Sequence, residues 1–257
     1  SMRPEDGNGA VEFQDVSYTY PGAAVPALSH VSFRLEPGKK IAVVGMNGSG
    51  KTTMVKLLCR LYDPDGGRVL LNGRNVREYD YEEYLRRFSV VFQDFQLLAL
   101  PLGENVAGGK DYDAAQVQDC LEKAGFGKRL QRMKDGLSTF LYRNMDQDGV
   151  EICGGEAQKI ALARALYKDA PIVVLDEPTA ALDPVSEHEV YSGFRNLVGG
   201  RTAIFISHRL SSCRFCDEIL VFHQGELVQR GSHEELVEAD GLYASMWRAQ
   251  AQYYEKF

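Results

Sequence analysis

The chain has 257 residues, of which 44% are hydrophobic and 25% are charged, a balance typical of a globular protein with a sizeable core. Its formal net charge of -7 leaves no basic field to hold a nucleic acid backbone, so nucleic acid is excluded as an expected partner. Apolar runs such as Ala170 to Leu175 are far shorter than the roughly 20 residues of a membrane-spanning helix.

The cysteines and the N-terminal residues indicate the expected cellular compartment and the extent of the protein. Five cysteines without framework spacing, and no signal peptide, favour reduced thiols in a cytosolic protein. Cys213 and Cys216 form a CxxC pair, but no second pair or matching histidine accompanies them, so we expect packing residues rather than a redox or zinc site. Residues 1–10 are interpreted as a tag remnant and a polar linker, and we expect the chain to be part of a longer protein.

A strand, a glycine-rich loop and a helix are predicted between Ile41 and Leu61. The apolar strand runs from Ile41 to Val44, and the chain breaks at Gly45. The helical pattern resumes at Thr52 and places one apolar face at Met54, Leu57, Leu58 and Leu61. This order is the context in which a glycine-rich loop binds phosphate.

The loop matches the pattern GxxxxGK[ST]. Gly45, Gly48 and Gly50 let the backbone fold around one anion with successive N–H groups pointing inward, and the helix end adds partial positive charge. Lys51 is expected to reach the β- and γ-phosphates, and the Thr52 hydroxyl to ligate Mg²⁺. The alternative is a glycine-rich loop that binds nothing.

Strands are also predicted on the N-terminal side of the loop. Val11 to Tyr18 alternates as a half-buried strand, and Val31 to Leu35 forms another. Between them lies Tyr20, whose ring can stack on a purine. The alternative is an ordinary surface or core tyrosine.

Two further strands are predicted after the loop. Arg68 to Leu71 precedes a turn at Asn72-Gly73, and Ser89 to Phe92 ends at Gln93. The Gln93 carboxamide can ligate a metal or orient a water, and the alternative is a solvated loop glutamine.

A helical insert is predicted between two halves of an α/β core. From Gly103 to Lys168 the pattern is helical, without a strong strand signal. Near its end, Gly154 and Gly155 precede the sequence AQKIALARALY, a helix that is apolar on most faces and is expected to be buried. Two glycines before a helix provide either a second anion-binding end or a simple turn.

Two acids follow the next apolar strand, Pro171 to Leu175, which is of the kind found inside a parallel sheet. Asp176 and Glu177 stand at its carboxyl end, where ligands of open α/β sheets bind. Asp176 can hold the water shell of Mg²⁺, and Glu177 can polarise an attacking water. The alternative is a helix N-cap with solvated charge.

One more buried strand, Thr202 to Ser207, ends at His208. This histidine can donate to the γ-phosphate, and the alternative is a structural histidine.

The remaining C-terminal elements are a helix, a hairpin and closing helices. We predict a helix from Ser186 to about Val198, a hairpin of Glu218 to Phe222 with Glu226 to Gln229, and helices from His233 onward.

Together these motifs resemble the nucleotide-binding domain of an ABC transporter, and more narrowly that of an ABC exporter. The resemblance covers Val11 to about Gln250 and rests on seven elements in the same order, and the terminal sequence GSHEELVEADGLYASMW also looks like exporter cassettes. It implies an α/β fold: a P-loop NTPase core with a mainly parallel sheet (about 11–93 and 171–257), an N-terminal antiparallel β subdomain and an inserted helical subdomain (about 94–170). The whole domain would span 11–257.

The resemblance also implies roles for the site residues. Catalysis falls to Lys51, Glu177 and His208, metal binding to Thr52, Gln93 and Asp176 (through water), and contact across a dimer to Asp183. The residues expected to bind ATP are Tyr20, Gly45, Met46, Asn47, Gly48, Ser49, Gly50, Lys51, Thr52, Thr53 and Gln93.

The signature segment departs from the family pattern LSGGQ, because this chain has Ile152, Cys153, Gly154, Gly155 and Glu156. A thiol is a weaker donor than a serine hydroxyl, and Glu156 brings a possible negative charge near a triphosphate unless it turns toward solvent. In the family this segment acts on the partner's nucleotide, so the departure concerns the partner's site.

The expected function is ATP binding and hydrolysis that powers transport by an ABC exporter, with ATP and Mg²⁺ as cofactors. The expected partners are a second nucleotide-binding domain, in a homodimer or a heterodimer, and the transmembrane domain of the exporter. The domain would lie on the cytoplasmic face of the membrane. The alternatives are a soluble ABC-family ATPase and a regulatory half that binds nucleotide with weak hydrolysis.

Overall fold

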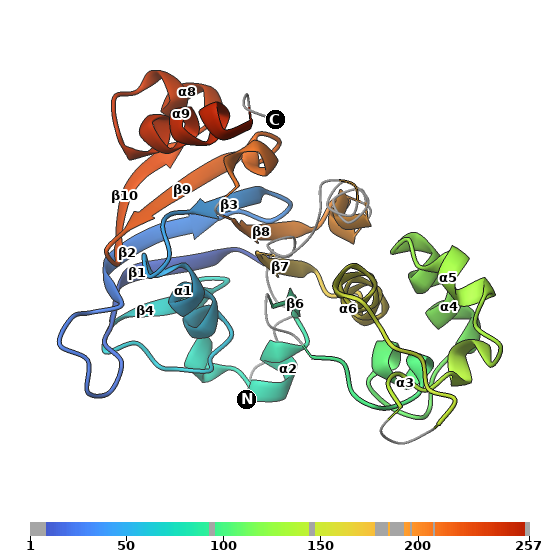
Figure 1. Cartoon of the computed structure of the whole chain (residues 1–257). Coiled ribbons are helices and arrows are strands. Elements are labelled where there is room, and N and C mark those ends of the chain that lie inside the picture. Colours follow the sequence, from blue (N-terminus) through green and yellow to red (C-terminus); the bar gives the residue numbers. More distant parts are fainter. Residues whose placement is uncertain are drawn as a thin grey trace. The chain divides into compact units, whose positions relative to one another are not determined.

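The computed structural model describes residues 9–92, 96–143, 147–177, 185, 193–195, 197–207 and 209–254. They fall into two compact units (Figure 1). The first comprises Ser1–Phe88, Val174–Asp176 and Arg201–Phe257, and the second comprises Ser89–Val173 and Glu177–Gly200.

An antiparallel sheet in the first unit has the order β2-β1-β4-β5. Its strands are β1 Val11–Tyr18, β2 Leu28–Leu35, β4 Gly66–Leu71 and β5 Arg74–Asn75. The prediction of a half-buried strand from Val11 to Tyr18 is confirmed, and its alternation shifts once, at a bulge between Phe13 and Val16. The next strand begins at Leu28, earlier than the predicted Val31, because Leu28 is fully buried and pairs with Tyr18.

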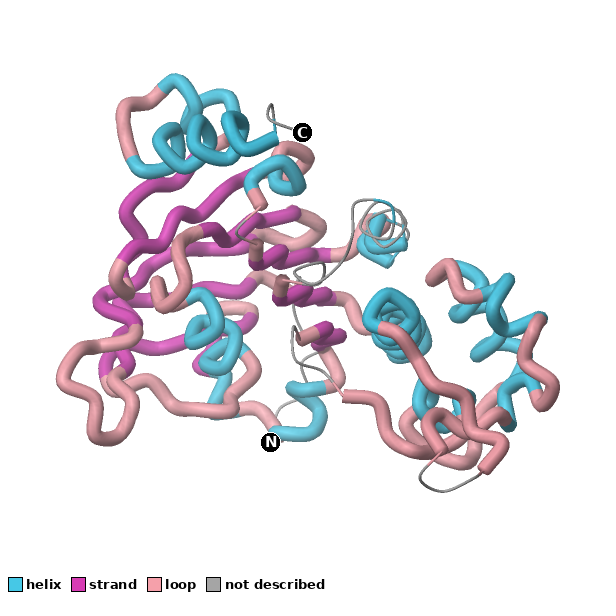
Figure 2. The backbone as a smooth tube through the Cα atoms, viewed as in Figure 1, coloured by secondary structure: helices cyan, strands magenta, loops and turns pink. Residues whose placement is uncertain are grey.

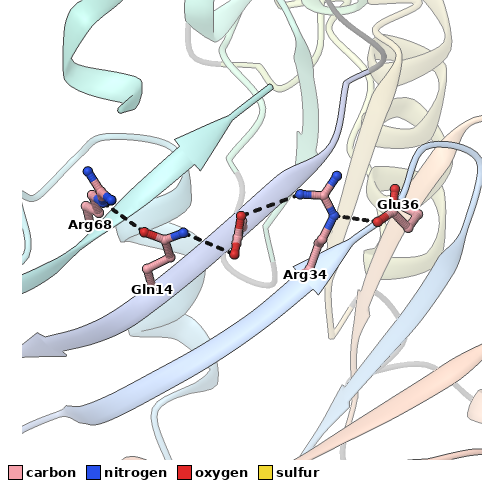
Figure 3. Close-up of polar contacts among 5 residues, drawn as sticks. Gln14, Arg34, Glu36 and Arg68 are labelled. Atoms are coloured by element: carbon pink, nitrogen blue, oxygen red, sulfur yellow. Dashed lines mark hydrogen bonds and ion pairs between the residues drawn. The ribbon is translucent and has the colours of Figure 1, made fainter. Parts of the chain in front are cut away.

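The polar side chains on this sheet form a row across three strands (Figure 3). Arg68 donates to Gln14 at 2.8 Å, and Gln14 donates to Glu12 at 3.2 Å. Arg34 donates to Glu12 at 3.5 Å and also to Glu36. The row follows from the register, since Gln14 lies opposite Arg68 and Glu12 lies opposite Arg34.

A second sheet has the order β10-β9-β3-β8-β7-β6, and its strands are magenta in Figure 2. The strands are β3 Lys40–Val44, β6 Phe88–Val91, β7 Ile172–Asp176, β8 Thr202–Ile206, β9 Glu218–His223 and β10 Glu226–Gly231. β3 pairs in parallel with β8 and β9, whereas β9 and β10 form an antiparallel hairpin. Every residue of β7 and β8 is buried, as continuous apolar runs predict.

The predicted boundaries in this sheet were wrong by one residue at several ends. β6 covers Phe88–Val91 instead of Ser89 to Phe92, and β7 includes Asp176 but not Pro171. β8 ends at Ile206, one residue before the predicted Ser207. Sequence periodicity marks the apolar centre of a strand, while its ends depend on pairing with neighbours.

Helix α1, Lys51–Leu58, follows the glycine-rich loop. The prediction that Leu61 continues its apolar face was wrong. Arg60 has a positive φ of 58°, which ends the helical path, and Leu61 is 50% exposed. A 3₁₀ turn, η1 Val76–Glu78, and α2, Tyr81–Leu85, come next in this unit.

The first unit closes with the 3₁₀ turn η3, Leu210–Cys213, and two helices after β10, α8 His233–Glu238 and α9 Leu242–Tyr254 (red in Figure 1). Ser232 caps α8, because its side chain accepts from Glu235 N at 3.2 Å and the Glu235 carboxylate reaches back to Ser232 N. The prediction of helices from His233 is confirmed.

The second unit contains the helices α3 Leu102–Ala107, α4 Ala114–Lys123, α5 Gly127–Gln131 and α6 Gly154–Lys168, and the 3₁₀ turn η2 Gly136–Ser138. Helices α3 and α4 each pack on α6. Val117, Leu121 and Ala124 are buried, as their helical spacing predicts. The prediction of helix without strand was incomplete, because isolated bridges join Pro101 to Phe140 and Leu141 to Val150.

Candidate functional site

The loop between β3 and α1 has the backbone that its glycines predict. Gly50 has φ 110°, and a Cβ there would stand 2.6 Å from Leu28 Cδ2 and 2.8 Å from Ala27 O. A Cβ on Gly45 would stand 2.5 Å from Phe222 O. Only glycine fits at these two positions without a shift of the surrounding backbone.

Two buried side chains indicate that this loop is an anion-binding site. Lys51 is 5% exposed, and its Nζ donates to the carbonyl oxygen of Gly45 at 2.6 Å. Ser49 is 3% exposed, and its Oγ has no hydrogen-bond partner among the described residues. An unsatisfied buried hydroxyl is costly, so the loop is suited to an oxygen-rich anion that would bond to Ser49 and bring negative charge to the Lys51 ammonium.

The other predicted loop residues differ in exposure. Met46, Asn47, Gly48 and Thr52 are exposed, whereas Thr53 is buried. The helix end of α1 and the exposed loop backbone therefore face solvent at the position where the sequence predicts phosphate and metal ligands.

Gly225, in the turn between β9 and β10, supports the loop from the far end of the chain. Its N–H donates to Ser49 O at 2.9 Å, and its carbonyl oxygen accepts from Ser29 N at 2.8 Å. A side chain on Gly225 would place a Cβ 2.8 Å from Ala27 O, so this turn and the loop fit together closely.

Tyr20 belongs to an aromatic cluster beside α1 that the sequence did not reveal. Its hydroxyl lies 2.9 Å from Thr53 Oγ1, and its ring meets those of Tyr18 and Tyr62 edge-on, with centroids 5.1 Å and 5.8 Å away. Lys56 Nζ lies 5.8 Å from the centroid of the Tyr20 ring. These contacts fix the plane of the Tyr20 ring, because an aromatic edge and a hydroxyl bond both restrict its rotation.

Asp176 and Glu177 follow one another at the end of β7. Asp176 is the last residue of the strand and is 5% exposed. Glu177 is partly exposed and has a φ of 45°. That left-handed conformation costs a non-glycine residue about 1–2 kcal/mol.

Hydrogen bonds at the N-terminus of α6 fix where the Glu156 carboxylate lies. Cys153 is the N-cap residue, and its N–H and Sγ donate to Glu156 Oε1 at 3.5 Å and 3.1 Å. Arg129, on α5, donates from Nε to Glu156 Oε2 at 2.8 Å. Burial opposes ionisation of Glu156, but the bonds from Cys153 and Arg129 outweigh it, so the pKa of this carboxyl lies below its usual value.

The prediction that Gly154 and Gly155 precede this helix was wrong in detail, since they form its first two positions. Gly154 is exposed, and a Cβ there would meet no atom within 4 Å. Gly154 therefore leaves the start of α6 accessible. The first N–H groups of a helix have no partner within the helix and can bind an external acceptor.

Three predicted site residues, Gln93, Asp183 and His208, lie outside the described residues, as does the predicted cap Ser186. The CxxC cysteines, by contrast, are described: both are free and buried. Burial raises the pKa of Cys213 to about 12, and it also raises the pKa of Cys216. Their environment agrees with the expected packing role.

A family model described as "ABC transporter" matches residues 28–180 of this chain. The chain belongs to the ABC transporter family. The match includes the loop from Gly45 to Thr52, the segment from Ile152 to Glu156, and Asp176 with Glu177.

The individual relatives of this chain within the ABC transporter family include flippases and an exporter. An ATP-dependent lipid A-core flippase from Paraburkholderia xenovorans (strain LB400) is 43% identical over 251 residues, covering 96% of this chain and 41% of the relative. One from Vibrio vulnificus (strain CMCP6) is 41% identical and covers 96% of this chain and 42% of the relative. The structure of a bacterial Atm1-family ABC exporter with ATP bound is 36% identical, with a TM-score of 0.86 over 95% of this chain and 42% of that one.

The chain is thus an ABC transporter ATP-binding ATPase domain, homologous to the nucleotide-binding domains of ABC exporters. The predicted fold, a mixed α/β ABC domain with a mainly parallel sheet and an antiparallel subdomain, is confirmed. The chain spans about two fifths of the length of these relatives. None of the described helices combines the length and apolar character that crossing a bilayer requires.

Sequence reasoning missed Tyr18, Tyr62, Lys56 and Arg129 as neighbours of the predicted site residues. Arg129 carried no signal of its own, because basic residues are common in short surface helices. Its ion-pair partner, Glu156, lies on α6, and η2 and a loop separate the two residues in the sequence.

Proposed function

We propose that this domain hydrolyses ATP at the loop between β3 and α1 and drives transport by an ABC exporter. The observation that carries the proposal is a loop with buried Lys51 and with buried Ser49, whose hydroxyl has no hydrogen-bond partner among the described residues, and in which only glycine fits at positions 45 and 50. In this proposal Lys51 and the loop N–H groups neutralise charge that develops on the γ-phosphate. Residues Gly45 to Thr53 bind the triphosphate.

Mg²⁺ is the proposed metal, held by Thr52, by Gln93 and, through water, by Asp176. Hydroxyl, carboxamide and carboxylate oxygens are hard ligands that suit this ion. The buried position of Asp176 at a strand end of the first unit supports its role, because Thr52 stands at the start of α1 in the same unit. The ion would supply charge neutralisation for the phosphates.

Glu177 is the proposed general base or water-orienting residue, and His208 the proposed donor to the γ-phosphate. The positive φ of Glu177 supports its role, since strained backbone persists at functional sites more often than elsewhere. General base catalysis by a positioned side chain typically contributes a rate factor of about 10²–10⁴.

Tyr20 is the proposed partner of the adenine ring. Its hydroxyl is engaged by Thr53 and Lys56 Nζ lies over one face of its ring, so the base would stack on the other face. Edge contacts from Tyr18 and Tyr62 hold that face in a set plane, which lowers the entropy lost on stacking.

A second nucleotide-binding domain is the proposed partner on ATP binding, in a homodimer or a heterodimer. The segment Cys153 to Glu156 would act on the partner's nucleotide, and Asp183 would cross the dimer contact. The accessible start of α6, with exposed Cys153 and Gly154, supports this role because helix N-termini attract anions.

The transmembrane domain of an exporter is the other proposed partner, which would hold this domain at the cytoplasmic face of the membrane. A cavity of about 430 Å³ in the second unit supports such docking. Leu98 and Leu100 line it and are 58% and 37% exposed, so an apolar side chain of the membrane domain would cover them.

The test is Glu177→Gln, with Glu238→Gln as control because Glu238 is exposed at the end of α8. The Glu177 variant should bind ATP with unchanged affinity in a nucleotide titration, and its phosphate release should fall by about 100-fold or more. Near-wild-type release from this variant would overturn the assignment. ATP binding without turnover in the unaltered protein would instead favour a regulatory, nucleotide-sensing half.

A further inference from the structure

The ion pair between Arg129 and Glu156 differs from the exposed ion pairs of this unit. The two side chains are 36% and 24% exposed, and Nε lies 2.8 Å from Oε2. The pair Lys123–Asp119 on α4, with a similar distance of 2.7 Å, has side chains that are 58% and 54% exposed. Water screens the Arg129 pair less, so its removal has a larger electrostatic effect.

Glu156 lies at the anion-attracting end of α6, so its charge affects what this helix end can bind. This carboxylate lies in the first turn of α6, where it interacts favourably with the helix dipole. For the same reason it competes with any external anion that approaches the helix start. A negative charge without compensation would repel a triphosphate at this end.

Hydrogen bonds to both carboxylate oxygens of Glu156 compensate its negative charge. One oxygen of Glu156 bonds to Arg129, and the other accepts from the N–H and Sγ of Cys153. Both oxygens are thus engaged by groups of the second unit. The carboxylate stays ionised, neutralised by the guanidinium, and folded back over the N-cap residue.

We propose that Arg129 is a positioning residue of the signature segment: it neutralises Glu156 and turns its carboxylate onto Cys153, which leaves the first N–H groups of α6 available to the partner's γ-phosphate. The inference rests on the proposed function for that phosphate. It extends that function by naming the cation that makes a glutamate compatible with an anion-binding helix end.

The test compares Arg129→Ala, Arg129→Lys, Glu156→Gln and the double variant Arg129→Ala/Glu156→Gln in the full chain. The control is Arg132→Ala, an exposed arginine that directly follows α5. Phosphate release over an ATP titration separates kcat from KM, and a fluorescent ATP analogue reports the nucleotide affinity of the same chain.

Arg129→Ala should lower kcat about ten-fold and leave affinity for the ATP analogue unchanged, since the charge acts at the partner's nucleotide. Arg129→Lys should retain most activity. The double variant should recover to within about three-fold of Glu156→Gln alone, because no charge then needs neutralising. Equal loss in Arg129→Ala and in the double variant would overturn the proposal, as would a loss no larger than that of Arg132→Ala.

A second readout, independent of turnover, is the alkylation rate of Cys153. In Arg129→Ala the Glu156 carboxylate is no longer held on Cys153 Sγ, so alkylation should speed up at least two-fold, whereas Arg129→Lys should keep the wild-type rate. Unchanged alkylation in Arg129→Ala would overturn the positioning role whatever the kinetics give. The expected alkylation pattern in a protein with no hydrolysis at any concentration would instead overturn the proposed function, together with the part of this inference that depends on it.

Discussion

The Nζ atom of Lys51 lies 2.6 Å from the carbonyl oxygen of Gly45, so the lysine reaches back from the start of α1 to the end of β3. The contact satisfies a buried ammonium and holds it at the centre of the loop. A phosphate oxygen attracts an ammonium more strongly than a neutral carbonyl does, because the phosphate carries a full charge.

Removal of the Lys51 amine should therefore weaken nucleotide binding. We expect Lys51→Ala to lose ATP affinity by about 10- to 100-fold, the cost of a hydrogen bond to a charged group. The matched control is Lys39→Ala, because Lys39 is exposed in the same unit. A nucleotide titration checks both variants, and equal affinities in the two would argue against Lys51 as a phosphate ligand.

The glycines of the loop should differ in how they tolerate a methyl group. At Gly48, with φ 79° and no atom within 4 Å of an added Cβ, alanine meets only backbone strain of about 1–2 kcal/mol. At Gly50 the added Cβ also overlaps Leu28 and the Ala27 carbonyl. Gly50→Ala should thus lower the free energy of unfolding by about 2 kcal/mol more than Gly48→Ala, measured by denaturant titration. Equal losses would contradict the packing around Gly50.

The five free cysteines should react in two groups. Cys153 is exposed, whereas Cys59, Cys120, Cys213 and Cys216 are buried. Burial raises the pKa of Cys120 and takes that of Cys213 to about 12, which keeps these thiols protonated at neutral pH. An aromatic disulfide reagent should modify one thiol rapidly in the native protein and five after unfolding. Cys153→Ser should abolish the rapid phase, and a remaining fast thiol would show that a buried site opens.

His233 should make stability dependent on pH. Burial lowers the pKa of this imidazole from its ordinary 6.5, nearby Arg214 lowers it further, and Glu234 opposes the shift. The unfolded chain therefore takes up the proton first as pH falls. The free energy of unfolding should be fully retained above about pH 6.5 and should decline below it until the folded imidazole is protonated as well.

Denaturant titrations at pH 7.5 and pH 5.5 measure this loss, with His233→Asn as the comparison because asparagine can still bond to Tyr243, whose hydroxyl lies 2.8 Å from His233 Nδ1. The variant should be less sensitive to acid than the wild type. The same acid sensitivity in both would assign the effect to other groups.

The parts of the fold that could be predicted from sequence are those with local causes. The boundaries of β1, Val11 and Tyr18, follow from a half-buried pattern that alternates on either side of the bulge between Phe13 and Val16. The turn at Asn72-Gly73 needs a positive φ at both residues. Asn72 has a φ of 54° and Gly73 a φ of 76°. Lys51 and the loop glycines were identified because their chemistry is encoded in adjacent residues.

What could not be predicted depends on contacts between distant residues. The aromatic cluster of Tyr18, Tyr20 and Tyr62 forms only when β1 and the end of α1 are brought together. The orientation of Glu156 depends on Arg129, which lies on a different helix. The end of α1 was placed too late, since leucine spacing continued to Leu61 while the backbone had already left the helical region at Arg60.

The bond from Gly225 to Ser49 has a consequence for protein synthesis. A ribosome releases β3, the loop and α1 well before it releases the hairpin that carries Gly225. Until that hairpin emerges, the nascent chain holds the complete motif but lacks one of its supports and the neighbouring strand β9. Nucleotide capture during translation is therefore expected to be a late event, timed by the C-terminal strands rather than by the appearance of the motif.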